Sequence, residues 1–157
     1  MKYLLALLAI AGIVVSMLAL RVHNQDPSQA PPCAVTEKFD CGAVNHSRYA
    51  VFPPRTFDED AKSGKLHIPV ATLGIVGYAL MAAFALAGRL VIVLELAQIG
   101  FFFAAMLTYL EAYVIQKWCI YCLWSQVIVA TILLLSAALL ASRWYAARRT
   151  PLTSKAV

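Results

Sequence analysis

Four long apolar stretches divide the chain and constrain its fold more than any other feature. They cover residues 3–20, 68–87, 90–116 and 119–141. A helix that crosses a bilayer needs about 20 predominantly apolar residues, so each stretch is long enough for one span. Backbone polar groups inside a membrane must pair within their own segment, which a helix achieves. The sequence therefore predicts an all-α membrane protein, a bundle of four transmembrane helices in a single domain.

The composition agrees with this interpretation and excludes other classes. Hydrophobic residues make up 62% of the 157 residues and charged residues 13%, whereas soluble domains are about half apolar and a quarter charged. The net charge is +5, and four of the 13 basic residues lie in the last 15 positions, beside the fourth apolar stretch. A basic segment beside a membrane span is typically attracted to an anionic membrane face, so we expect no nucleic-acid partner.

The first apolar stretch has two interpretations, a cleaved signal peptide and a membrane span. A signal peptide has an apolar region of about 7–15 residues, followed by small residues before the cleavage site. The stretch here has 18 residues, and the nearest candidate site, Ser28-Gln29-Ala30, is followed by Pro31. We therefore expect an uncleaved first span.

A polar segment, residues 21–67, separates the first two spans. Proline pairs at 31–32 and 53–54 bracket its middle, and we expect a short helix near Gly42–Phe52. Four spans place both termini, with the tail 142–157, on one side of the membrane and this loop on the other. Lysine and arginine counts, six against seven, do not settle the orientation by the positive-inside rule. All four cysteines share the loop side, and disulfides need an oxidising compartment, so that side is expected to be extracytoplasmic.

The fourth span begins with a C-x-x-C motif, Cys119-Ile120-Tyr121-Cys122. At a helix start the two sulfurs lie one turn apart on the same face. The free N–H groups and partial positive charge of a helix N-terminus lower the pKa of the first cysteine, as a reversible disulfide requires. A structural disulfide and half of a zinc site are the alternatives. The three histidines lack ligand spacing, so we expect no metal.

The other two cysteines, Cys33 and Cys41, enclose seven residues of the loop. A disulfide between them closes a small ring and stabilises the fold by only roughly 2–3 kcal/mol in the chain-entropy estimate. A structural staple is the default interpretation of this pair. Because both pairs are expected on one face of the membrane, exchange of electrons between them is the functional alternative.

In order along the chain, these residues resemble the bacterial form of the vitamin K epoxide reductase family, over nearly the whole length. Cys33 to Cys41 has the family's spacing of loop cysteines, and Ser47 stands where the family has a serine. Residues 68–78 are similar to the bacterial second span, and residues 109–122 to the end of the third span with the redox motif. The DsbB family, a functional analogue with four spans and a quinone, has its C-x-x-C in the first outer loop instead. A DsbB-like enzyme of independent origin would catalyse the same reaction.

The resemblance implies a thiol:quinone oxidoreductase of the bacterial inner membrane that generates disulfides for exported proteins, with its active site on the periplasmic or extracytoplasmic side. A reduced thioredoxin-like partner attacks Cys33, Cys41 then attacks Cys119, and Cys122 passes electrons to ubiquinone or menaquinone. Many bacterial relatives carry a fused thioredoxin-like domain. This chain ends 16 residues beyond Ala141, so a separate DsbA-like protein is the expected partner.

Two departures from the family bear on the substrate. Members that reduce the vitamin epoxide have asparagine and tyrosine where this chain has Val70 and Gln126, so the resemblance implies quinone rather than epoxide reduction. Candidate quinone contacts are Ser47, Glu111 and Gln126. Their alternatives are a surface serine, a carboxylate at the outer interface and a bond between helices.

A second class of function is a non-enzymatic membrane scaffold or partner-binding module stapled by two structural disulfides. In that case the cysteines do not exchange and no quinone binds. Oxidation of a thioredoxin-like protein that depends on quinone distinguishes the two classes.

Overall fold

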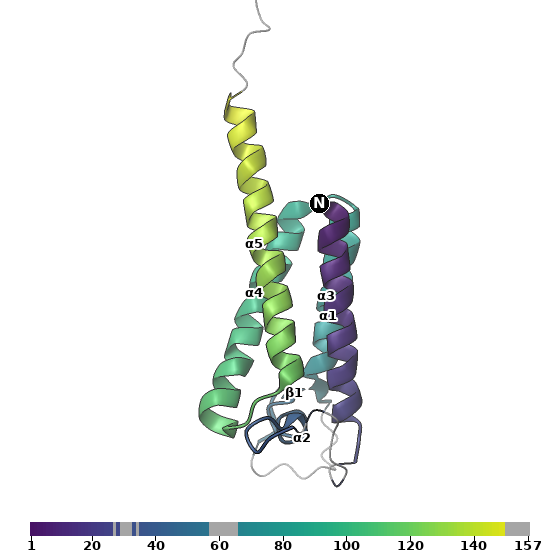
Figure 1. Ribbon diagram of the computed structural model, residues 1–157. Coiled ribbons are helices and arrows are strands. Elements are labelled where there is room, and N and C mark those ends of the chain that lie inside the picture. The colour runs from purple at the N-terminus through teal and green to yellow at the C-terminus, as the bar shows by residue number, and fades with distance from the viewer. Residues whose placement is uncertain (27, 29–32, 34, 57–65, 150–157) are drawn as a thin grey trace, which may run out of the picture.

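The computed structural model describes residues 1–26, 28, 33, 35–56 and 66–149. Within these ranges four long helices run along a common axis (Figure 1). They are α1 (Lys2–His23), α3 (Val70–Leu86), α4 (Leu90–Leu110) and α5 (Ile120–Arg149). A tight turn at Gly88, with a φ of 74°, joins α3 to α4. The N-terminus lies at one end of the bundle, and α2 and β1 lie at the other.

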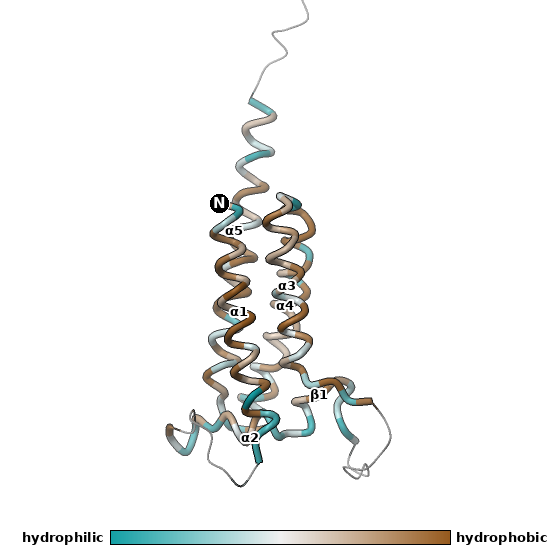
Figure 2. The backbone as a smooth tube through the Cα atoms, turned by 90° about the vertical axis from the view of Figure 1, so that its right-hand side faces the viewer, coloured by the Kyte–Doolittle hydropathy of each residue, from teal (hydrophilic) through white to brown (hydrophobic). Residues whose placement is uncertain are grey.

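Three of the described helices are long and apolar enough to cross a membrane. They are Lys2–His23, Leu90–Ile115 and Ile120–Arg149, and the apolar α3, with 17 residues, is shorter. At 1.5 Å per residue, α3 is about 26 Å long, against a hydrocarbon core of about 30 Å. Figure 2 shows hydrophobic residues along the helices and hydrophilic ones gathered at the loop end and along the last turns of α5.

The loop differs from the expected helix over Gly42–Phe52. A helix of five residues, α2 (Cys41–Asn45), is present, and the Asp40 side chain caps it by accepting the Ala43 N–H at 3.1 Å. Val51–Phe52 instead forms strand β1, antiparallel to β2 (Ile68–Pro69), so the second long helix begins at Val70 rather than at residue 68. Phe52 and Ile68 each precede a proline, and a residue in that position is driven towards extended backbone.

The last helix also extends beyond its expected end. The expected span ends at residue 141 and α5 continues to Arg149, so residues 142–149 of the expected tail are helical. Residues 142–149 contain no glycine or proline, and arginine and alanine are good helix formers. The Arg148 guanidinium lies 3.5 Å from the centre of the Trp144 ring, one turn away. Residues 150–157 of the expected tail lie outside the described residues.

Small residues let α1 and α3 pack closely. A Cβ atom added at Gly12 would lie 2.5 Å from the ring of Tyr78. The Tyr78 hydroxyl donates to the Ser125 carbonyl at 2.8 Å, so this one side chain joins α1, α3 and α5. Separate from the core between the long helices, a buried cluster lies at the loop end and comprises Val22, Cys33, Cys41, Val44 and Cys119.

Candidate functional site

The two cysteine pairs are brought together by backbone pairing between the loop and the segment before α5. Phe39 and Trp118 form a parallel β-bridge. The Trp118 N–H donates to the Lys38 carbonyl at 2.8 Å, and the Asp40 N–H donates to the Trp118 carbonyl at 3.1 Å. The Lys117 ammonium also donates to the Glu37 carbonyl. Because these contacts immediately precede Cys41 and Cys119, they place the start of α2 against the start of α5.

All four cysteines predicted from the sequence lie in this region. Cys33 and Cys41 form a disulfide, whereas Cys119 and Cys122 are free thiols. Cys41 and Cys119 are each 0% exposed, and Cys33 is 5% exposed. Cys122 packs against the same buried cluster. The site therefore holds one disulfide and one dithiol side by side, as electron exchange between two pairs requires.

The C-x-x-C motif stands at the start of α5 as expected. Cys119 immediately precedes the helix, in the connection between the candidate spans Leu90–Ile115 and Ile120–Arg149. Its pKa is lowered, and the largest cause is a hydrogen bond with the Cys122 side chain. A lowered pKa was expected for Cys119 from its place at a helix N-terminus, but the largest contribution comes from the Cys122 thiol. Since the thiolate is the reactive form of cysteine, Cys119 is suited to exchange.

Glu111 is buried beside the C-x-x-C motif. It is 1% exposed and begins a single π-helical turn, η1 (Glu111–Ile115), which is followed by Gln116 in the left-handed region at a φ of 57°. The Oε2 atom of Glu111 accepts the Cys119 N–H at 3.0 Å. Its Oε1 atom has no hydrogen-bond partner among the described residues. A π turn shifts the register of a helix and is frequent at functional sites. Glu111 is therefore buried within the protein, against Cys119.

Asn45 is a residue of the site that the sequence interpretation missed. Its amide Nδ2 donates to the Cys41 carbonyl at 2.9 Å and lies within hydrogen-bond distance of Cys119 Sγ, at 3.5 Å. The side chain is 7% exposed. The sequence signal for it is slight: a side-chain amide four residues after Cys41, one helical turn along.

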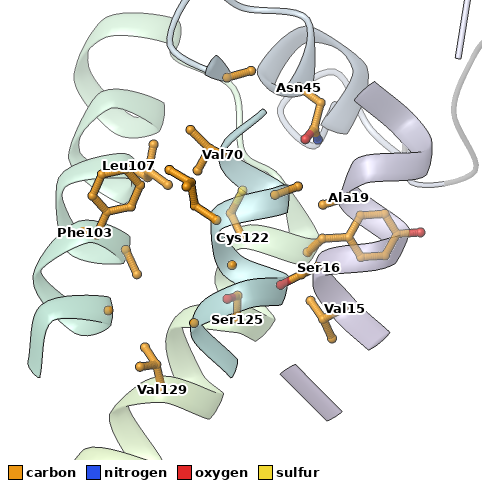
Figure 3. Close-up of a pocket in the computed structure, with 18 of the residues that line it drawn as sticks. Val15, Ser16, Ala19, Asn45, Val70, Phe103, Leu107, Cys122, Ser125 and Val129 are labelled. Carbon is orange, nitrogen blue, oxygen red and sulfur yellow. The ribbon is translucent and has the colours of Figure 1, made fainter. Parts of the chain in front are cut away.

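A cavity of about 330 Å³ lies next to Cys122. Figure 3 shows the Cys122 sulfur between Leu107 and Phe103 on one side and Ser16 on the other, with Asn45 at one end of the cavity. Ser47, Glu111 and Val70 also line it. Small-molecule sites typically have volumes of about 300–1,000 Å³ and mostly apolar walls with few polar groups. The cavity has that size and character.

Two polar atoms of the cavity residues are available to a ligand. Ser47 Oγ and Glu111 Oε1 are both buried and lack a hydrogen-bond partner among the residues that the structure describes. Gln126, the third predicted contact, is not part of the cavity lining. Its Oε1 atom accepts the Thr108 hydroxyl and so joins α5 to α4. A ligand that accepts from the Gln126 amide N–H groups would leave that bond in place.

The comparisons with known proteins agree with these features. A family model described as the vitamin K epoxide reductase family matches residues 3–137. This range contains all four cysteines and the residues that line the cavity. No curated protein matches the chain. Within the described ranges, no group of three or more histidine, cysteine or acidic side chains is arranged to hold a metal ion.

Proposed function

The chain belongs to the vitamin K epoxide reductase family, and we propose that it oxidises a thioredoxin-like protein and passes the electrons to a membrane quinone. Membership makes it a membrane thiol oxidoreductase with a cysteine set able to form disulfides. The single observation that supports the finer proposal best is the packing of a disulfide and a dithiol in one cluster beside a cavity.

The proposed topology has four spans, with α3 as the second, and both termini in the cytoplasm of a bacterial cell. All four cysteines then lie at the periplasmic or extracytoplasmic end, where disulfides persist. A reporter fused after Arg149 should be active only if it is of the type that works in the cytosol. Activity of a periplasmic reporter there would reverse the orientation.

The proposed relay begins with a reduced thioredoxin-like partner, separate from this chain. A partner thiolate attacks Cys33, the more exposed cysteine of the loop disulfide at 5% against 0% for Cys41, and Cys41 leaves as a thiolate. Cys41 then attacks Cys119 of an oxidised Cys119–Cys122 pair, and Cys122 leaves as a thiolate beside the cavity. The partner's second thiolate releases Cys33 and leaves with a new disulfide.

The last exchange of the relay takes place within the protein and restores the loop disulfide. Cys33 attacks Cys41 in the Cys41–Cys119 bond, which re-forms the loop disulfide and releases Cys119 as a thiolate. Two electrons have now moved from the partner to Cys119 and Cys122. This arrangement of one disulfide and two thiols is also the one in the structure.

The cavity fits the head of a quinone. A quinone ring is flat and apolar, with two carbonyl oxygens that accept hydrogen bonds, and when bound it supplies a two-electron, two-proton acceptor. The Ser47 hydroxyl, and Glu111 once it has taken up a proton, would donate to those oxygens. Ser47 Oγ and Glu111 Oε1 lack hydrogen-bond partners within the described residues. Val70 adds an apolar wall where epoxide-reducing relatives have asparagine. We therefore propose ubiquinone or menaquinone, rather than an epoxide, as the substrate.

The test is turnover by the purified protein with a reduced thioredoxin-like protein and a ubiquinone or menaquinone analogue. We expect the partner disulfide and the quinol to form in equal amounts, and Cys122→Ser to abolish both. Vitamin K epoxide should be consumed much more slowly, and comparable turnover would show that Val70 does not govern substrate choice. If neither product forms and no disulfide exchange occurs, the protein is a scaffold with two inert pairs.

A further inference from the structure

Asn45 contacts both cysteine pairs through the N–H group of a neutral side chain. Its amide bonds the carbonyl of Cys41 and reaches the sulfur of Cys119, 74 residues away in sequence. The side chain is more than nine-tenths buried, so water does not compete for this donor. A donor held at a sulfur in a dry site favours the thiolate over the thiol.

The short helix that bears Asn45 is fixed at both ends. Asp40 caps its first turn. At its last residue, the Asn45 carbonyl is bonded to His23 Nδ1 of α1. His46 follows the helix, and its ring nitrogens contact the carbonyls of Gly42 and Gln25. These contacts hold the Asn45 amide in place, and a donor fixed in advance needs little reorganisation when charge develops.

We propose that Asn45 is a catalytic residue whose amide N–H stabilises Cys119 as the leaving thiolate. This inference rests on the proposed relay. In the step concerned, the Cys33 thiolate attacks Cys41, the Cys33–Cys41 bond forms, the Cys41–Cys119 bond breaks, and the electron pair stays on Cys119. A better-stabilised leaving thiolate makes thiol exchange faster and more favourable.

The other groups that face Cys119 make such a donor useful. From η1, the Glu111 carboxylate raises the pKa of Cys119 through its charge, although it also accepts the Cys119 N–H. From α5, the Cys122 thiol lowers that pKa. From α2, Cys41 is held in a disulfide and does not titrate, and the Asn45 amide of that helix lies 3.5 Å from the Cys119 sulfur.

A single exchange equilibrium measures this effect. In the full-length Cys122→Ser protein three cysteines remain, and one disulfide can lie either at Cys33–Cys41, with Cys119 free, or at Cys41–Cys119, with Cys33 free. Rapid alkylation labels the free cysteine, and peptide mapping gives the ratio of label at Cys119 to label at Cys33. The variants Asn45→Leu and Asn45→Asp are then added to this background.

We expect Asn45→Leu to shift the ratio about tenfold towards Cys41–Cys119 at alkaline pH, and Asn45→Asp to shift it further because its charge opposes the thiolate. At a pH low enough to protonate the thiols, the shift with Asn45→Leu should shrink. Asn45→Asp preserves the side-chain size and provides the test if the leucine variant does not fold. Val44→Ala is the matched control, since it loosens the same helix and leaves the donor unchanged.

Failure of this proposal and failure of the relay give different results. If the Asn45 variants shift the ratio no more than Val44→Ala, and equally at every pH, Asn45 has only a structural role. If the Cys41–Cys119 bond forms in none of these proteins, including the parent with Asn45 intact, the relay itself fails.

Discussion

The two cysteine pairs differ in what holds them in place. Cys41 begins a helix of five residues, which meets the rest of the site through a few backbone hydrogen bonds at Lys38, Asp40 and Trp118. Cys119 and Cys122 stand at the start of a helix of 30 residues, with the buried carboxylate of Glu111 against the first of them. Displacing the loop pair, Cys33 and Cys41, breaks these bonds and those that Asn45 of α2 makes with His23 and Cys119, but it leaves the long helices intact. Displacing the helix pair, Cys119 and Cys122, disrupts α5 itself. This difference suits a relay in which one pair meets partners and the other remains beside the acceptor.

The largest expected effect comes from removing one cysteine of each pair. The variant Cys33→Ser, Cys122→Ser leaves Cys41 and Cys119 as its only cysteines, each without the thiol that would resolve a bond between them. Because the pairing of Lys38 and Asp40 with Trp118 places Cys41 next to Cys119, we expect nearly complete formation of a Cys41–Cys119 disulfide. Peptide mapping before and after reduction measures it, and partner oxidation should be abolished.

The matched control for this trap is Cys41→Ser, Cys122→Ser, which leaves Cys33 and Cys119. Little or no disulfide should form in it. If Cys33 joins Cys119 instead, the roles assigned to the two loop cysteines are reversed. If neither variant forms a disulfide under oxidising conditions, the two cysteine pairs are structural and do not exchange electrons.

A second change affects only the helix pair. Glu111→Gln keeps an oxygen that can accept the Cys119 N–H but removes the acid, and we expect quinone reduction to fall by about 10²-fold, the lower end for loss of a proton donor or acceptor. The negative charge of Glu111 raises the pKa of Cys119, so its removal should shift alkylation of Cys119 to lower pH. Glu111→Leu should also destabilise the fold by about 1–3 kcal/mol, because a buried N–H loses its acceptor.

These two readouts separate the roles of Glu111. If quinone turnover is unchanged in Glu111→Gln, the role of Glu111 is only to accept the Cys119 N–H. A shift of the alkylation curve to higher pH would contradict the sign of the charge effect. Exchange between Cys41 and Cys119, measured in the trap background, should persist in Glu111→Gln.

The sequence alone could predict the helices and the cysteines but not how side chains meet across the site. Apolar stretches and the C-x-x-C motif are local patterns. At the loop end of the bundle, the bounds of three long helices lie within a few residues of the bounds expected from these patterns. Asn45 escaped prediction because its contact with Cys119 depends on pairing between residues 38–40 and Trp118. Gln126 was expected near a quinone from its place one turn after Cys122, but it is not among the residues that line the cavity, and its oxygen accepts the hydroxyl of Thr108 on another helix.

A third change tests the cavity beneath the helix pair. Gly12→Val adds a side chain whose Cβ atom would lie 2.5 Å from the Tyr78 ring, so the ring has to move and its bond to Ser125 is lost. Overpacking of this kind costs about 1–3 kcal/mol. Because Tyr78 lines the cavity, KM for the quinone should rise, while exchange between the cysteine pairs continues. The double variant Gly12→Val, Tyr78→Ala, which makes room for valine, should recover part of the lost stability.

The smallest expected effect lies on the loop pair. Asp40→Ala removes the cap of α2, whose oxygen accepts the Ala43 N–H, and loss of an N-cap typically costs about 1 kcal/mol. A less stable α2 positions Cys41 less well, so partner oxidation should slow severalfold, while direct reduction of the quinone by a small dithiol that attacks Cys119–Cys122 stays unchanged. Asp40→Asn retains a capping oxygen and should behave almost as the parent. If Asp40→Ala slows both reactions equally, the two pairs depend on one common structure, and the contrast between a displaceable loop pair and a fixed helix pair is wrong.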